Sequence, residues 1–301
     1  MARTNVVLCN AFAKVQRNPH LVVWTALVVA LCLAALILPN ITPYSPIQAN
    51  LQDVNHAPSA AYLLGTDSVG RDILSRTMAA LPTSLFAAFG IALASFAIGV
   101  VVGALSGYIG GWLDTVIMRI VDAFMAFPQL VLAIAVAGLL GGGLTNAMIA
   151  LVAVAWTRYA RLARAQVLSV KTRTYITAAR ISGASGLSIA FKHVVPNILQ
   201  PLIIMVCLDV GNMVLNLAGL SFLGLGAAPP TPELGSMINQ AAATFQTAPW
   251  AVFAPGAVLF IIVVVLNMFG DAVNDALNSH TSQIPVKRRS CISATVDEKG
   301  L

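Results

Sequence analysis

Long stretches without a charged residue dominate this sequence and limit the folds that it can adopt. Leu21–Leu38, Leu85–Leu105 and Ala251–Gly270 contain eighteen, twenty-one and twenty residues, with no Asp, Glu, Lys or Arg. A helix rises about 1.5 Å per residue, so each stretch approaches or exceeds the roughly 30 Å hydrocarbon core of a bilayer. Only 9% of the residues are charged, against about 25% in soluble domains. The chain is therefore predicted to be an all-α integral membrane protein.

Three further spans complete a predicted domain of six transmembrane helices within residues 21–280. The third is Ala123–Leu140, and the fourth, Ala147–Thr157, is short and continues as helix into the basic segment behind it. The fifth begins near Ile198 and ends near Leu225.

This threading places the basic segments, within residues 1–20, 158–192 and 287–289, on one side of the membrane. Lys and Arg hold the segments between spans in the cytoplasm. Residues 1–20 and the tail 281–301 of this multi-pass membrane protein are thus predicted to be cytoplasmic, and the tail is predicted to be disordered. The net charge of +6 does not indicate nucleic acid binding, because the basic residues lie between apolar spans without interleaved aromatics.

The sequence contains no signal for a cofactor bound by this chain. Its four cysteines are scattered and form no C-x-x-C pair, so neither a zinc site nor a disulfide framework is indicated. No G-x-x-x-x-G-K-[ST] motif occurs. Any ATP and Mg²⁺ that this protein depends on are therefore predicted to be bound by other chains.

The segment from Arg158 to Pro196 carries seven Lys or Arg and no acid. Its first arginines recur at helical spacing, which favours contact with anionic lipid headgroups at the inner surface. Small residues follow, then a glycine that permits a sharp turn and a proline suited to the first turn of a helix. The segment is interpreted as helix, turn and helix, the alternative being an ordinary linker. The residues concerned are Arg158, Arg161, Arg164, Thr177, Ala178, Ala179, Gly183 and Pro196.

This pattern resembles the cytoplasmic coupling loop of ABC importer permeases, Glu-Ala-Ala, three residues, Gly, nine residues, Ile-x-Leu-Pro. Ala178, Ala179, Gly183 and Pro196 match in spacing, whereas Thr177 stands in place of the glutamate. The resemblance implies that the loop docks into a cleft of an ATPase subunit. Thr177 removes any salt bridge made by that glutamate and leaves docking by shape.

Further motifs in the same order resemble the second permease of dipeptide, oligopeptide and nickel importers. The resemblance implies a type I ABC importer permease fold without catalytic residues, and dipeptides or oligopeptides as substrate, with nickel or a metal chelate as the alternative. It also implies a second homologous permease, two ATP-binding subunits and an extracytoplasmic substrate-binding protein as partners. The motifs are LLGTDSVGRDILSR (Leu63–Arg76), GYIGGWLD (Gly107–Asp114), MRIVDAFMAFP (Met118–Pro128), AGLSFLGLGAAPPTPELG (Ala218–Gly235) and FGDAVNDAL (Phe269–Leu277).

The first of these motifs lies before the second span, on the predicted outer side. Thr66 or Asp67 is expected to cap a helix, and Asp72 is spaced to pair with Arg76 one turn later. A structural role is favoured over seating of the binding protein. The residues of this outer motif are Gly65, Thr66, Asp67, Gly70, Arg71, Asp72 and Arg76.

Asp209 is the clearest acid within a predicted span. A carboxylate at mid-membrane costs about 2.5–3.5 kcal/mol on insertion scales, so it should face a cavity or a partner. Asp209, Asn212 and Asn216 share one helix face. They are interpreted as lining a translocation path for a cationic chelate or a peptide amino terminus, and the acid moves some weight to nickel. The alternative is a buried residue hydrogen-bonded to a neighbouring helix.

Two other classes of protein remain as alternatives. A secondary transporter or channel would carry intramembrane charges and often an internal repeat, and no convincing repeat is present. A membrane anchor would not depend on Asp209 at all.

Overall fold

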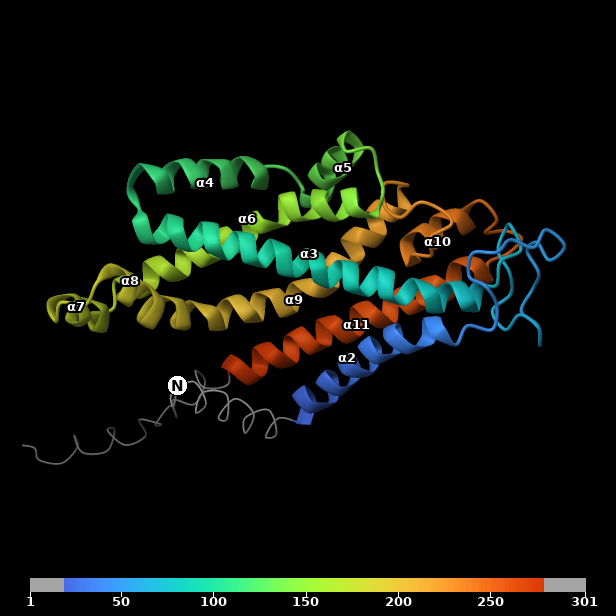
Figure 1. Cartoon of the computed structure of the whole chain (residues 1–301), viewed down its shortest axis with the longest axis horizontal. Helices are drawn as coiled ribbons and strands as arrows, with labels where there is room; N and C mark the ends of the chain where they lie inside the picture. Colours follow the sequence, from blue (N-terminus) through green and yellow to red (C-terminus); the bar gives the residue numbers. More distant parts are fainter. Residues whose placement is uncertain (1–18, 279–301) are drawn as a thin grey trace, which may run out of the picture.

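The computed structural model describes residues 19–278, and residues 1–18 and 279–301 lie outside the described part. The predicted disorder of the tail 281–301 and nearly all of the predicted segment 1–20 therefore fall outside it. Within residues 19–278 the named elements are all helices. The helices run roughly along one long axis (Figure 1).

Within residues 19–278, four helical runs are long and apolar enough to cross a bilayer. The first combines α2 (Pro19–Ile37) and the short 3-10 helix η1 (Leu38–Asn40), and the second is α3 (Ile73–Ile109). The third, Ala190–Phe222, joins the π-helical turn η2 (Ala190–Val194) to α9 (Val195–Phe222), and the fourth is α11 (Trp250–Asn278).

The predicted third span is wrong as a single helix. The chain forms α4 (Gly111–Met125) and α5 (Gln129–Leu139), bent by 92° across a short break. Pro128 causes the break, because proline has no N–H and keeps the residue before it out of the α region. If this pair is one span, the described residues contain five candidates.

Helix α6 (Leu144–Lys171) occupies the place of the predicted fourth span. It continues as helix into the basic segment, as predicted, and its arginines keep it from counting as an apolar span. The predicted number of six spans is therefore not confirmed.

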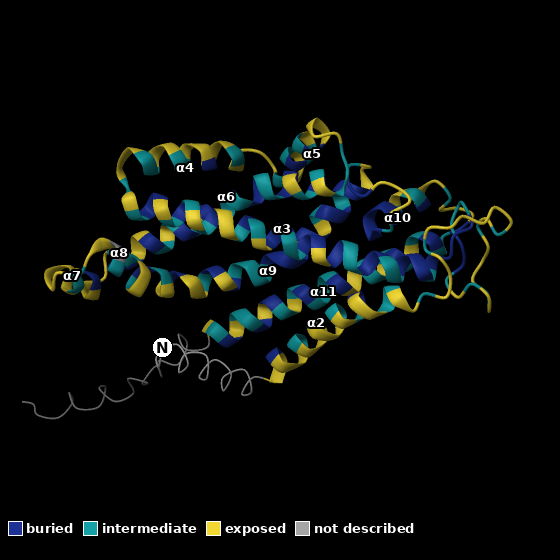
Figure 2. Ribbon diagram, in the orientation of Figure 1, coloured by how far each residue is buried: buried dark blue, intermediate teal, exposed yellow. Residues whose placement is uncertain are grey.

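Close packing of α3 on α6 forms the centre of the bundle. A Cβ added at Gly103 would lie 2.7 Å from the Cα and the carbonyl carbon of Ala160, and one at Gly107 would lie 3.1 Å from the carbonyl oxygen of Arg164. Gly99 is equally tight against α6. Small residues four apart let helix backbones approach closely in a membrane, so Gly99 and Gly103 allow α3 and α6 to pack backbone against backbone. Buried residues follow the line where α3, α6 and α9 meet (Figure 2).

The two ends of the bundle differ. One end carries α7 (Thr174–Ile181) and α8 (Gly186–Ile189), between α6 and α9 (Figure 1). The other carries the loops of residues 41–72 and α10 (Leu234–Ala242). The predicted coupling loop and the predicted outer motif therefore lie at opposite ends.

Candidate functional site

The first site is the turn between α7 and α8. Gly183 has φ +83°, in the left-handed region that glycine adopts most easily. Its N–H donates to the carbonyl of Arg180 at 3.0 Å, and the N–H of Ala184 donates to that of Ala179 at 3.1 Å. These two bonds close the end of α7 in a Schellman motif. The predicted helix, turn and helix are thus present, with Gly183 at the turn.

One side of this turn is anchored in the bundle. Ile176 is buried in an apolar cluster with Ile189 and Val194. Lys171, the last residue of α6, donates to the carbonyls of Gly107 and Tyr108 at 3.2 and 2.8 Å. It therefore satisfies carbonyl groups at the end of α3 and joins that end to the start of the turn.

The other side faces outward. Thr177 and Ala178 are exposed, Ala179 is half-buried, and Ile181 is 84% exposed. Pro196 lies in the first turn of α9, directly after η2, where its missing N–H does not interrupt the helix. The segment presents an exposed surface of small, apolar and basic residues, which the buried Ile176 supports.

The second site is a layer of ion pairs on α6. Arg158 pairs with Asp209 of α9 at 3.0 Å, and Arg161 with Asp122 of α4 at 2.5 Å. Arg164 binds Asp114 of α4 through both carboxylate oxygens, at 2.5 and 2.7 Å. Each of these arginines is thus paired with an acid of a neighbouring helix, and their expected contact with lipid headgroups stays a prediction.

Asp209 is nearly inaccessible, with its side chain 3% exposed. Besides Arg158 it accepts a bond from the buried hydroxyl of Tyr159 at 2.8 Å and one from the amide of Asn212 at 3.4 Å. Asn212 is exposed and Asn216 half-buried. The three residues of the predicted polar stripe therefore differ: Asn212 and Asn216 are at least partly accessible, whereas Asp209 is buried against Arg158 and Tyr159 of α6.

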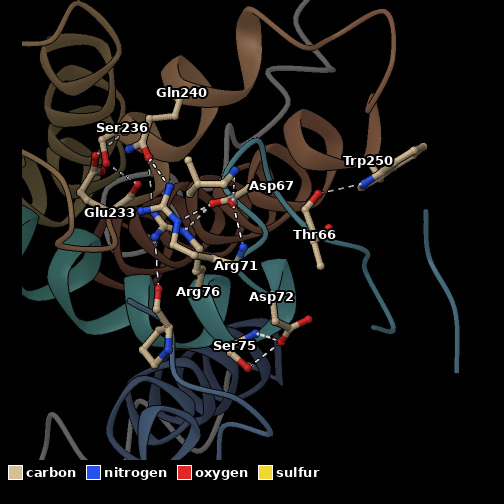
Figure 3. A network of polar contacts seen from close by, with 12 residues as sticks. Thr66, Asp67, Arg71, Asp72, Ser75, Arg76, Glu233, Ser236, Gln240 and Trp250 are labelled. Atoms are coloured by element: carbon tan, nitrogen blue, oxygen red, sulfur yellow. Dashed lines mark hydrogen bonds and ion pairs between the residues drawn. The ribbon is translucent and has the colours of Figure 1, made fainter. Parts of the chain in front are cut away.

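The third site is a buried polar network at the outer-motif end (Figure 3). Asp67 pairs with Arg71 at 2.7 Å and with Arg76 at 3.6 Å. Both arginines are buried, and Arg71 donates to Gln240 of α10 at 2.8 Å. Arg76 donates to the carbonyl of Pro46 at 3.1 Å. The network joins the loop, the start of α3 and α10.

The expectation that Thr66 or Asp67 caps the helix is wrong, because the cap lies five or six residues later. The helix begins at Ile73, and Asp72 is its N-cap, accepting from the N–H of Ser75 at 2.8 Å. Arg76 pairs with Asp67, so the expected Asp72–Arg76 pair does not form. Thr66 is buried and bonds the loop backbone at His56, and Gly70 packs its backbone on Asn50.

Gly65, the remaining residue of the outer motif, packs against the loop and α11. A Cβ there would lie 2.6 Å from the carbonyl oxygen of His56 and 2.6 Å from the indole nitrogen of Trp250. Its φ is +73°, so both the space and the backbone favour glycine.

Comparison with known proteins decides the family. Residues 99–283 match the family described as binding-protein-dependent transport system inner membrane component. The chain belongs to this family. It is 39% identical over 274 residues to the dipeptide transport system permease protein DppC of Haemophilus influenzae, covering 89% of this chain and 93% of that protein.

Other relatives define the branch of the family. The nickel transport system permease protein NikC of Escherichia coli is 40% identical over 262 residues, covering 85% of this chain and 95% of NikC. The glutathione transport system permease protein GsiD of Pectobacterium atrosepticum is 40% identical over 225 residues, 75% of each chain. The protein is an ABC importer permease of the dipeptide/nickel type, a multi-pass membrane protein of a kind that is not itself catalytic.

The fold of the permease also matches a solved structure. An inward-facing conformation of the MetNI methionine ABC transporter superposes with a TM-score of 0.53 at 24% identity, covering 65% of this chain and 93% of that one. The predicted type I importer permease fold is confirmed.

Sequence reasoning missed one residue that organises the permease. Glu233 is fully buried and caps α10, accepting from the N–H groups of Gly235 and Ser236 at 3.0 and 2.8 Å. The hydroxyl of Ser84 on α3 donates to it at 3.1 Å. An acid directly before a new helix is a capping signal that the sequence does contain.

Proposed function

We propose that this permease is one of two transmembrane subunits of an importer that moves dipeptides or oligopeptides into the cytoplasm. ATP is hydrolysed by two partner ATPase subunits, which bind the ATP and Mg²⁺, and an extracytoplasmic binding protein delivers the substrate. The observation that supports this most is the turn at Gly183, which presents an exposed surface at one end of the bundle and is fixed to α3, α6 and α9.

In this mechanism the ATPase docks on the exposed side of α7 and its motion is carried into the membrane. Closure of the two ATPases moves the turn, and the buried contact of Ile176 transmits that movement to α9. The path then opens to the outer side, receives the substrate, and opens inward when the ATPases separate. Asn212 and Asn216 face this path, and Asp209 acts on it through Arg158.

The orientation follows from the same assignment. The α7 end and both termini are cytoplasmic, and the loops of residues 41–72 face the outer side. Ile47, Leu51 and Leu63, which are 54%, 78% and 64% exposed there, offer an apolar surface to the binding protein. Single cysteines at Ile181 and Leu63 test this: a membrane-impermeant thiol reagent applied to intact cells should label only the second.

The coupling role is tested with two substitutions at one position. Gly183→Asp should abolish uptake while the protein still inserts, because a carboxylate would be buried against the docked ATPase. Gly183→Asn is the matched control, since asparagine has the same size, carries no charge and tolerates a positive φ. Equal uptake by both variants would remove the docking role, and purification without ATPase subunits would point to a secondary transporter.

Nickel, alone or as a chelate, is the second candidate substrate, favoured by the 40% identity to NikC. The binding protein selects the ligand, so calorimetry of the cognate binding protein with peptides and with nickel chelates decides between them. Binding of nickel chelates without peptide binding would replace our first choice.

A further inference from the structure

A cavity of about 90 Å³ lies at the bend between α4 and α5. Phe124, Phe127 and Gln129 line it from the bend, and Thr157 and Arg158 line it from α6. A water molecule needs only about 10–15 Å³ of such space, so the cavity has room for a group of several atoms. The predicted polar stripe does not include any of these five residues.

Two side chains that line this cavity, Gln129 and Arg158, carry hydrogen-bond donors without a partner in the described part of the chain. The side-chain nitrogen of Gln129 is buried and has no hydrogen-bond partner within residues 19–278. Arg158 is 40% exposed and, among the described residues, donates one bond, to Asp209. A guanidinium has five N–H donors, so most remain available. The hydroxyl of Thr157 is already used, donating to the carbonyl of Val154 at 2.8 Å.

Asp209, the acid that pairs with Arg158, does not line the cavity. Asp209 is buried behind Arg158, with one oxygen on the guanidinium and the other on Tyr159. A solute in the cavity therefore meets the guanidinium first. The charge that a solute meets is thus positive, whereas the negative carboxylate of Asp209 was expected from the sequence to select the substrate.

We propose that the cavity binds a carboxylate of the transported solute, with Arg158 as its charged partner and Gln129 as an amide donor. The planar guanidinium matches a carboxylate in shape and charge. A peptide supplies such a group at its carboxyl terminus, whereas a hydrated metal cation would be repelled. The proposal rests on the proposed function, and it names the part of the substrate that the permease itself reads.

The charge of the cavity can be tested without any transport. Gln129→Cys is made in a chain whose native cysteines are replaced, and its reaction with an anionic and a cationic methanethiosulfonate is timed. The anionic reagent should react about tenfold faster, relative to a free thiol, because a charged cleft concentrates the opposite charge. Faster reaction of the cationic reagent, or no reaction with either, overturns the proposal.

Two companion variants show where that preference comes from. The double variant Arg158→Gln, Asp209→Asn should abolish the preference for the anionic reagent. This double variant leaves no unpaired charge that would disturb folding. Arg161→Gln, one turn further along α6 and paired with Asp122, should leave the preference unchanged. Persistence of the preference in the double variant excludes Arg158 as its source.

Recognition of the substrate is tested in the reconstituted transporter with saturating binding protein, using a dipeptide and its C-terminal amide. Gln129→Leu should slow uptake of the free acid about three- to tenfold, as expected for one lost hydrogen bond. It should slow the amide less, because a hydrogen bond to a neutral carbonyl is weaker than one to a carboxylate. The fold should persist, since this nitrogen has no protein partner to lose. An equal effect on both peptides, or none, overturns the carboxylate site. Failure of the unaltered transporter to move either peptide overturns the proposed function instead, while the thiol reaction still reports the charge.

Discussion

Gly103 offers a sharp test of the packing at the centre of the permease. A Cβ at this position would lie 2.7 Å from two backbone carbons of Ala160, whereas non-bonded carbons settle at about 3.5–4.0 Å. Gly103→Ala must therefore push α3 and α6 apart by about 1 Å, because backbone atoms cannot rotate away. Overpacking of this kind costs about 1–3 kcal/mol. At about 2 °C per kcal/mol for a protein of this size, the midpoint of thermal unfolding should fall by about 2–6 °C.

The measurement is thermal unfolding of the purified permease in detergent, followed by the fluorescence of its four tryptophans. Gly256→Ala is the matched control in α11, since a Cβ there meets no atom within 4 Å. That variant should unfold at or slightly above the midpoint of the unaltered protein, because alanine favours helix over glycine. If the two variants have the same midpoint, α3 and α6 are not in backbone contact and the reasoning is refuted.

Three further predictions concern the outer end. Glu233→Ala should destabilise the permease by about 2–4 kcal/mol, since it removes a helix cap and leaves buried donors unpaired. Glu233→Gln should destabilise it less, and thermal unfolding in detergent compares the two variants. Asp67→Asn should lower the yield of folded protein, because it leaves two buried arginines without a counter-charge, and size-exclusion chromatography would show an unchanged yield if this is wrong. The hydrogen bond from Tyr62 to Asp53 raises the pKa of the Tyr62 phenol. The stability that this bond contributes is therefore present below about pH 10 and is lost as the pH rises through the raised pKa. Ultraviolet titration of the unaltered protein and of Tyr62→Phe should show that the variant lacks one phenol that titrates late.

The sequence predicted the helical character of the permease because runs without charge have few other solutions in a membrane. It also located the turn at Gly183, where the backbone requires a residue that tolerates positive φ. It did not predict the bend at Pro128, although the proline was visible, because an apolar run with a proline near its start is compatible with a straight span as well.

The sequence alone could not predict which charged residues pair with one another across helices. Asp209 was expected to need a partner, yet its charged partner, Arg158, lies 51 residues earlier in the chain. Which helix face meets which is set by close contacts such as Gly103 on Ala160, and spacing within one helix does not report it. For the same reason the sequence predicted lipid contact for arginines that have acids opposite them.

Helix α3 has 37 residues, which gives a rod of about 56 Å, well beyond the hydrocarbon core. It is fastened at both ends, by Arg76 in the outer network and by Lys171 on its last carbonyls. Between these ends it rests on α6 at a row of glycines. If α3 moves as a rigid rod about this backbone contact, a displacement of its end beside the α7–α8 turn is accompanied by an opposite displacement of its end beside the loops of residues 41–72.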